Sequence, residues 1–298
     1  MDIKSTLKKG EAILRAVNNK SASNDARVLL SHVLNCSQTF LISHYDYQLS
    51  KDEEAKFAEF IELRAKGVPL QYITGKQEFM SLHFKVNPHV LIPRQETEIL
   101  VETIIDYVRN RRSTLKNSKS ILNKKNTLNI LDIGTGSGCI AISLAYYIQN
   151  CFIIATDISK DALETARLNA SLNGVDGKID FVVSDLFENI GSKKFDIIVS
   201  NPPYIAKKDL ERLDSEVKDY EPATALDGGE DGLDFYRAII PKAPFYLKEG
   251  GILAFEIGYN QARDVVCLME KFFSDIRIIK DLDKNDRVVI GGISSERI

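Results

Sequence analysis

The chain has 298 residues, of which 44% are hydrophobic and 27% are charged, and its formal net charge is −3. This composition is typical of globular proteins of about two domains. It excludes a global positive field that would attract nucleic acid, although it is compatible with a local basic patch.

The N-terminal segment and the cysteines and histidines exclude further classes of protein. The charged N-terminus has no secretory apolar core and no apolar run could span a bilayer, so we expect a cytoplasmic protein without a membrane partner. The four cysteines are scattered without metal-site or redox-pair spacing, and no bound metal is expected. All four histidines lie in the first 89 residues, so the rest of the chain cannot form a Ser-His-Asp triad alone.

Residues 1–75 are predicted to form a small helical domain. In DARVLLSHVL and EEAKFAEFIELRAKG, apolar residues recur at the spacing of helices with one buried face, and Phe57 and Phe60 are expected in the core. Residues 76–93 contain QEFMSLHFKVNPHVLIP, in which apolar and polar residues alternate. This pattern predicts a β-hairpin linker around Asn87-Pro88.

Residues 94–298 are predicted to form the main domain. It begins with the helical pattern RQETEILVETIIDYVRN, in which Glu96 and Glu98 favour the start of a helix. The stretch RRSTLKNSKSILNKKNT, residues 111–127, is polar and basic and has no acidic residue. It is either a solvated surface connection or a contact for RNA or DNA.

Strands and helices alternate after this stretch, which predicts a doubly wound α/β fold with a mostly parallel sheet. The last two strands are too close in sequence for a helical crossover, so we expect them to form an antiparallel C-terminal hairpin. The seven predicted strands lie in LNILDIG, CFIIATDIS, KIDFVVSDLF, FDIIVSNPPYI, GILAFEIG, IRIIKDL and RVVIGGI.

A glycine-rich loop, LDIGTGSGCIA, joins the first of these strands to a helix. Its form is D-x-G-x-G-x-G, which is neither the G-x-G-x-x-G dinucleotide fingerprint nor a P-loop. Gly134, Gly136 and Gly138 permit a tight turn and let a ligand approach the backbone closely. The loop suits an adenosine with a short charged tail.

Two acidic residues end the next two strands. Asp157 lies where an acid commonly binds the hydroxyls of a ribose, and Asp185 is placed to meet the adenine. The alternative for Asp157 is a helix N-cap, a role that Asp161 could share. Together with the glycine loop, the two acids favour nucleotide-like binding.

The sequence NPPY follows the fourth strand, which must end there because proline cannot donate to a sheet. Asn201 is therefore expected near the switch point where doubly wound sheets bind ligands. A planar nitrogen placed there would donate to the Asn201 side-chain oxygen and the Pro202 carbonyl, while Tyr204 stacks on its plane. The alternative is a plain turn built by Pro202 and Pro203.

These motifs resemble those of class I S-adenosylmethionine-dependent methyltransferases, a class that also reverses its last strand. The resemblance implies that S-adenosylmethionine is the cofactor, that Asp157 binds its ribose, and that Asp185 with Leu186 lines the adenine region. Asn201 is also expected to border the cofactor. The loop residues that would hold the methionine part are Asp132, Gly134, Thr135, Gly136, Ser137 and Gly138.

The chain is similar, nearly end to end, to the protein-(glutamine-N5) methyltransferases that modify peptide chain release factors, the HemK/PrmC family. This resemblance is carried by DARVLL, PLQYITGKQEF, FKVNPHVLIPRQETEILVE, LDIGTGSGCIAISLA, SNPPYI and EPATALDGGEDGLDFYRAII. It implies that the substrate is the glutamine of the Gly-Gly-Gln loop in class I release factors, which the N-terminal helices would grip elsewhere. Asn201, Pro202, Pro203 and Tyr204 would bind the glutamine, and Asn201, Pro202 and Tyr204 would be catalytic.

The chain departs from the family pattern at two places. Gln95-Glu96 follows Arg94 where the family often has Pro-Asp, which puts Arg94 and Glu96 in doubt as site residues. Leu186 replaces a frequent aromatic residue, although Phe187 is adjacent. The segment DGGEDGLD, residues 227–234, is interpreted as a loop that ends in a helix N-cap.

Two other functions are compatible with parts of the sequence. NPPY also occurs in methyltransferases that act on adenine N6 or guanine N2, and such an enzyme would use the basic stretch for phosphates. A cofactor-binding module that assembles with the translation machinery without catalysis is the third hypothesis. A release factor methyltransferase is the preferred interpretation, with nucleic acid not expected as a partner and a monomeric state expected.

Overall fold

The computed structural model describes residues 1–117 and 127–293, with the side chains of 112–117 excepted. Residues 118–126 of the basic stretch at 111–127 therefore lie outside the described residues, whereas residues 111–117 are helical. The chain forms two compact units. Unit 1 consists of Met1–Lys76 and Asp214–Tyr220, and unit 2 consists of Gln77–Leu213 and the chain from Glu221 onward. The sequence did not indicate that residues 214–220 group with the N-terminal helices.

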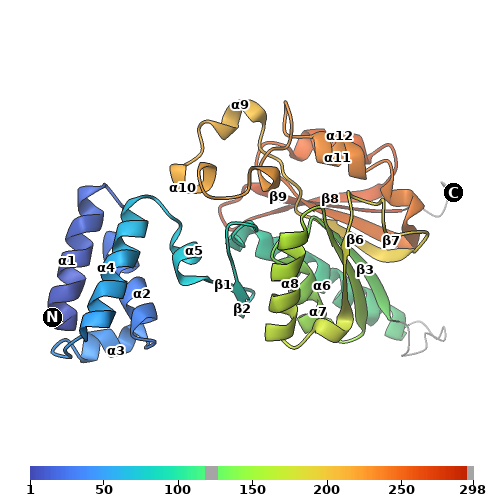
Figure 1. Ribbon diagram of the computed structural model, residues 1–298. Coiled ribbons are helices and arrows are strands. Elements are labelled where there is room, and N and C mark those ends of the chain that lie inside the picture. The colour runs from blue at the N-terminus through green and yellow to red at the C-terminus, as the bar shows by residue number, and fades with distance from the viewer. Residues whose placement is uncertain (118–126, 294–298) are drawn as a thin grey trace. The chain divides into compact units, whose positions relative to one another are not determined.

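Unit 1 is built from short amphipathic helices (Figure 1). Local signals fix two of the helix starts, because Asp2 accepts a hydrogen bond from the backbone of Ser5, and Ser50 and Glu53 form a capping box. Phe57 and Phe60 are buried in the core, as predicted. The helices of unit 1 are α1 (Ile3–Ala16), α2 (Ala22–Val33), α3 (Gln38–Ser43), α4 (Lys51–Ala65), α5 (Leu70–Thr74) and α10 (Ser215–Lys218).

A buried arginine ties the distant segment into unit 1. The Arg64 side chain is 7% exposed, and its Nε lies 2.7 Å from Asp25 Oδ2. Its Nη2 lies 2.6 Å from Oε1 of Glu216, which belongs to α10. Because one guanidinium serves two carboxylates, burial of its charge is compensated on both sides.

Unit 2 begins with the hairpin of β1 (Lys76–Phe79) and β2 (Leu82–Lys85). A hairpin is present, but its predicted turn at Asn87-Pro88 is wrong, because the chain turns at Met80-Ser81. Both turn residues have positive φ, 50° and 57°, which is the geometry of a tight hairpin turn. Glycine or asparagine usually marks such a turn, and neither occurs at Met80-Ser81, so no local signal predicts it.

The central sheet of unit 2 has the order β5-β4-β3-β6-β7-β9-β8. Strands β3 to β7 pair in parallel, and β9 pairs antiparallel with β7 and β8, so the predicted fold is confirmed with its C-terminal reversal. Its strands are β3 (Leu128–Ile133), β4 (Cys151–Asp157), β5 (Ile179–Val183), β6 (Phe195–Ser200), β7 (Leu247–Glu256), β8 (Ser274–Lys280) and β9 (Asp286–Gly292).

Helices cover both faces of this sheet (Figure 1). Alternate strand residues face the two sides, so Ile130 and Ile153 join one apolar cluster while Leu131 and Ile154 join the other. The first cluster includes α6 (Gln95–Asn117), α7 (Cys139–Tyr147) and α8 (Lys160–Leu172), and the second includes α11 (Asp234–Ile239) and α12 (Ala262–Met269). Unit 2 also contains α9 (Lys207–Leu210), η1 (Asp176–Lys178), η2 (Ala223–Ala225) and η3 (Ala243–Phe245).

No helix within residues 1–117 and 127–293 combines the length and the apolar character needed to cross a bilayer.

Candidate active site

The carboxyl ends of the parallel strands place the predicted site residues at one edge of the sheet. Asp132 lies in β3, Asp157 ends β4, Asp185 follows β5, and Asn201 follows β6. The chain leaves β3 for β4 and β5 on one side and returns to β6 on the other. This reversal creates the switch point at which doubly wound sheets bind ligands.

The glycine loop is held in shape by backbone bonds and leaves open space beside it. The amides of Gly134 and Thr135 both donate to the carbonyl of Thr156, and Gly134, Gly136 and Gly138 have φ values of 72°, 55° and 84°. A Cβ on Gly134 or Gly136 would meet nothing within 4 Å, whereas one on Gly138 would lie 2.8 Å from Ile142 Cδ1. The first two glycines therefore leave room for a ligand, and the third lets α7 pack.

Asp132 is fully buried beside this loop. Its Oδ2 accepts a hydrogen bond of 2.6 Å from the hydroxyl of Thr135, and its Oδ1 has no partner among the described residues. Burial raises its pKa to about 7. An unpaired buried carboxylate oxygen is suited to a cationic group of a ligand, which would return this pKa toward its ordinary range.

Asn169 binds the backbone of the glycine loop. The sequence analysis did not identify this residue. It is fully buried in α8, and its Nδ2 donates to the carbonyls of Ser137 at 2.9 Å and Lys85 at 3.0 Å. Its Oδ1 accepts from the Lys85 amide at 2.6 Å. One side chain thus joins the glycine loop to the hairpin, but nothing in a single sequence distinguishes it from other helical asparagines.

Asp157 links β4 to the glycine loop. Its Oδ2 accepts from the Gly136 amide and its Oδ1 from the Ser159 amide, each at 2.9 Å. Burial raises the pKa of Asp157, and these amide bonds oppose that effect. The alternative of an N-cap is wrong, because Ser159 caps α8 through a hydrogen bond from Ala162. Asp157 is thereby left at the sheet edge beside the loop.

Asp185 and Leu186 lie on the same edge, beyond β5. Asp185 is exposed, and Leu186 has a positive φ of 47°. The neighbouring Phe187 does not offer a free ring, because it is buried and stacks on Tyr246 with a centroid distance of 4.5 Å. Phe187 therefore does not take the place of the aromatic residue that the family often has at position 186.

The NPPY segment leaves β6 in an extended path that a second segment supports. Ile205 pairs with Asp227 in an isolated parallel bridge, its amide donates to Leu226, and its carbonyl accepts from Gly228. The Asn201 Nδ2 donates to the Thr97 hydroxyl at 3.1 Å, and the Tyr204 hydroxyl donates to Glu256 Oε1 at 3.3 Å. The side chains of Asn201 and Tyr204 are thus each hydrogen-bonded to a buried residue.

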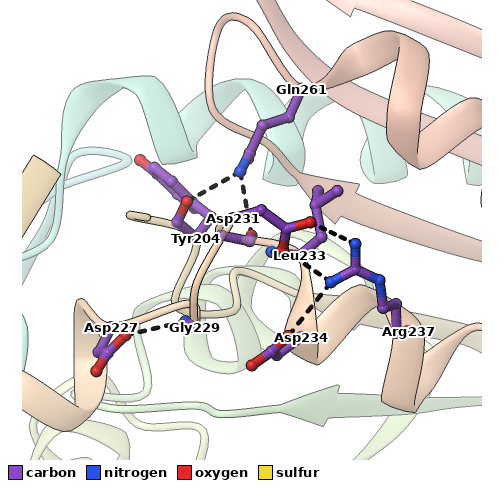
Figure 2. Close-up of polar contacts among 9 residues, drawn as sticks. Tyr204, Asp227, Gly229, Asp231, Leu233, Asp234, Arg237 and Gln261 are labelled. Carbon is purple, nitrogen blue, oxygen red and sulfur yellow. Dashed lines mark hydrogen bonds and ion pairs between the residues drawn. The ribbon is translucent and has the colours of Figure 1, made fainter. Parts of the chain in front are cut away.

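The loop of residues 227–234 packs against Tyr204, as Figure 2 shows. Gln261 Nε2 donates to the Tyr204 carbonyl at 2.9 Å and to the Gly232 carbonyl at 3.1 Å. Arg237 binds Asp231 through both terminal nitrogens. The interpretation of this segment as a loop that ends in a helix N-cap agrees with the structure, in which Leu233 occupies the cap position of α11 without a side-chain bond. Asp227 and Asp231 accept hydrogen bonds from backbone amides within the loop.

Gly232 is the most restricted residue of this loop. It has a φ of +80°, and a Cβ there would lie 2.4 Å from the Tyr204 carbonyl oxygen. We expect Gly232→Ala to destabilise the protein by about 2–5 kcal/mol, because the left-handed strain and the overpacking add. Gly191→Ala is the matched control, since its φ is +65° and nothing lies within 4 Å. Chemical denaturation measures both, and equal losses would show that contact with Tyr204 has no cost.

Glu256 is the buried acid of this region, and it was also missed. It ends β7 with 1% exposure, and its Oε2 has no partner among the described residues. Burial raises its pKa to about 7, against the opposing effects of a hydrogen bond from Thr97, the charge of Arg287 and the bond from Tyr204, while Glu96 raises it further. The sequence signal that could have identified Glu256 is the presence of an acidic residue inside the apolar run GILAFEIG.

The raised pKa predicts how stability depends on pH. The folded state holds the Glu256 proton more tightly than the unfolded state, so this contribution is complete below the ordinary value of 4.5 and is lost as pH rises through about 7. We expect Glu256→Gln to lose less stability than the wild type between about pH 5 and about pH 8. Thermal unfolding without cofactor measures this, and parallel pH profiles would contradict it. Asp132, which the variant retains, contributes with the same sign.

The residue of this stretch that binds Asn201 is Thr97, and neither Arg94 nor Glu96 has this contact. Arg94 forms an ion pair with Glu221, whose other oxygen accepts from the Ile92 amide. Thr97, which is 2% exposed, is the residue of this stretch that binds Asn201. The structure therefore assigns Arg94 to support of the loop after residue 220 and brings Thr97 to the site.

Comparison with known sequence families identifies both parts of the chain. Residues 5–75 match the PrmC N-terminal domain, and residues 118–216 match the methyltransferase small domain. Among solved structures, the hMettl16 catalytic domain in complex with the MAT2A 3′UTR hairpin 6 has a TM-score of 0.55 and 15% identity, covering 83% of this chain and 84% of that one. This likeness shows the fold alone.

Curated relatives match almost the full length. The release factor glutamine methyltransferase of Clostridium acetobutylicum is 39% identical over 293 residues, which cover 97% of this chain and 98% of the relative. That of Geobacter sulfurreducens is 41% identical over 275 residues, covering 92% and 90%. Identity at this level over nearly the whole length confirms the resemblance seen in the motifs. The chain is a methyltransferase that belongs to the release factor glutamine methyltransferase family.

Proposed function

We propose that this enzyme methylates the side-chain amide nitrogen, N5, of the glutamine in the Gly-Gly-Gln loop of class I peptide chain release factors. The observation that carries this proposal is the relationship to release factor glutamine methyltransferases over nearly the full length, with both the helical N-terminal part and NPPY included. The site geometry agrees, because Asn201 and Tyr204 lie together where the chain leaves β6.

The glutamine amide is proposed to bind against NPPY. Its two N–H groups donate to Asn201 Oδ1 and to the Pro202 carbonyl, and its plane stacks on Tyr204. Pro202 and Pro203 fix the backbone, so the carbonyl is oriented before the substrate arrives. An amide nitrogen is a poor nucleophile because its lone pair is delocalised, and two acceptors stabilise the positive charge that develops on it during attack.

The cofactor is S-adenosylmethionine, which supplies an electrophilic methyl group on a sulfonium. The residues at the sheet edge fit it, because the unpaired Asp132 Oδ1 is suited to its ammonium group and the open space at Gly134 and Gly136 admits its methionine part. Thr135, Ser137 and Gly138 complete that loop. We propose that Asp157 binds the ribose and that Asp185 with Leu186 borders the adenine.

Positioning supplies much of the rate enhancement in this mechanism. Well-oriented reactants can gain roughly 7–11 kcal/mol over the reaction in solution. Asn201 is proposed to border both the glutamine amide and the cofactor, and it would hold the amide nitrogen in line with the methyl group. Unit 1 is proposed to bind the release factor away from the glutamine. A release factor substrate also implies a cytoplasmic enzyme, and we propose that it acts as a monomer.

The test uses labelled S-adenosylmethionine with a purified release factor and with its Gln→Ala variant in the Gly-Gly-Gln loop. Label on the wild-type release factor alone is the expected result. Label on neither protein, with label appearing on total RNA or DNA in a parallel reaction, would overturn the proposal in favour of a nucleic-acid amino-methyltransferase.

A further inference from the structure

We propose that Gln261 is a positioning residue that holds the backbone of Tyr204, and with it the ring on which the substrate amide stacks. Gln261 lies 57 residues after Tyr204 in the sequence, between β7 and α12. This inference rests on the proposed function, in which Tyr204 stacks on the glutamine of the release factor.

The side chain of Gln261 joins three segments of the backbone, and it is 7% exposed. Its Nε2 donates to the carbonyl of Tyr204 at 2.9 Å, and Tyr204 belongs to the segment that leaves β6. The same nitrogen donates to the carbonyl of Gly232 at 3.1 Å, in the loop of residues 227–234 (Figure 2). Its Oε1 accepts from the amide of Gly258 at 2.9 Å, where the chain leaves β7. One buried amide therefore fixes Tyr204 against two other segments.

The orientation of this amide is determined by its partners. A backbone carbonyl can only accept a hydrogen bond, and a backbone N–H can only donate one. The NH₂ group of Gln261 must therefore face Tyr204 and Gly232, and its oxygen must face Gly258. This assignment does not depend on telling the two similar ends of a glutamine amide apart. Both hydrogens of the NH₂ group are used, one for each carbonyl.

The helix that begins at Gln261 does not use this side chain. Gln261 occupies the N-cap position of α12, where serine, threonine, aspartate and asparagine are preferred because their side chains accept from the first amides of a helix. The Gln261 side chain forms no such bond. Its hydrogen-bonding groups serve the segment of Tyr204 instead of the helix start.

Close packing makes the position of Tyr204 sensitive to these bonds. A Cβ on Gly258 would lie 3.5 Å from Tyr204 Cδ2, and one on Gly232 would lie 2.4 Å from the Tyr204 carbonyl oxygen. The backbone of two segments thus lies against Tyr204, and Gln261 is the side chain that bonds it to both. Without the amide, the carbonyls of Tyr204 and Gly232 would lose this buried donor, and the segments would shift to find other partners.

The test replaces Gln261 in two ways. Gln261→Met keeps the length of the side chain and removes the amide, whereas Gln261→Glu keeps an acceptor for Gly258 and removes both donors. We expect both variants to lower kcat on the release factor by up to about 100-fold, because a misplacement of about 1 Å can cost that much. KM for the release factor and Kd for S-adenosylmethionine should change far less, since both are proposed to bind mainly elsewhere.

Val175→Ala is the control that separates loss of position from loss of stability. Val175 is 5% exposed and belongs to the apolar cluster on one face of the sheet, whereas Tyr204 packs against the cluster on the other face. Its truncation should lower the melting temperature and leave kcat near that of the wild type. If kcat in both Gln261 variants equalled kcat in Val175→Ala, the proposal would be overturned.

A second measurement does not depend on the substrate. The tyrosines are replaced with 3-fluorotyrosine, and the fluorine resonance of Tyr204 is assigned by its loss in Tyr204→Phe. We expect this resonance to shift and broaden in Gln261→Met and Gln261→Glu and to stay unchanged in Val175→Ala. An unchanged resonance in the Gln261 variants would refute the positioning role. If the wild type fails to label a release factor, the proposed substrate is wrong, while the fluorine spectra still decide whether Gln261 holds Tyr204.

Discussion

Replacing Asn201 with alanine is expected to lower kcat on a release factor by about 100- to 1,000-fold, the usual effect of removing one oriented group that stabilises developing charge. The acceptor at Oδ1 interacts most strongly when the attacking nitrogen gains positive charge, so its loss raises the barrier more than it weakens substrate binding. The KM for the release factor should therefore change little. Steady-state methyl transfer with labelled cofactor measures both constants.

Asn285→Ala is the matched control for this substitution. Asn285 is an exposed asparagine between β8 and β9, so its removal should leave kcat unchanged. Turnover in Asn201→Ala equal to that of the wild type would refute the binding of the glutamine by NPPY. If binding of the release factor were kept and methyl transfer lost, as we expect, a purely non-catalytic module would be excluded.

The second large effect is expected from Asp157→Ala, which should raise the Kd for S-adenosylmethionine by roughly 10- to 100-fold. A hydrogen bond to a charged group contributes about 1.5–3 kcal/mol, and the ribose would lose such a partner. The Gly136 amide would lose its acceptor as well, which loosens the glycine loop. Isothermal titration of the purified protein with the cofactor measures the affinity.

Asp161→Ala provides the comparison, because its carboxylate lies in the first turn of α8 and its side chain is 62% exposed. This variant should bind the cofactor like the wild type. Thermal unfolding of both variants checks that the fold survives. An unchanged Kd in Asp157→Ala would mean that the residue acts only on the local backbone, through Gly136 and Ser159.

The fold was predictable because its determinants are local and repeated. Alternating strands and helices, glycines between β3 and α7, and prolines after β6 each restrict the backbone at one place, and together they allow one topology. The turn at Met80-Ser81 was not predictable, because neither residue favours a positive φ and the pairing of β1 with β2 decides it. The grouping of residues 214–220 with unit 1 depends on a contact across the sequence, between Arg64 and Glu216.

The residues proposed for the site also fall into two groups: those whose positions follow from local sequence signals and those that depend on partners far away in the chain. Asp157 ends β4 and Asn201 directly follows β6, so their positions follow from the topology alone. Thr97, Asn169 and Glu256 matter through partners far away in the chain, and no spacing rule connects Thr97 with Asn201. Glu256 could have been suspected, because a carboxylate within an apolar strand requires a compensating reason.

The assignment of Asp214–Tyr220 to the N-terminal unit has a consequence for the exchange of domains between relatives. The chain passes from one unit to the other after Lys76, after Leu213 and after Tyr220. A chimaera that replaces only the helices before residue 76 would keep Glu216 but would replace the helix that carries its partner, Arg64. To exchange this unit between such enzymes, residues 214–220 have to be exchanged together with the N-terminal helices, because one structural unit is encoded by two separate segments of the chain.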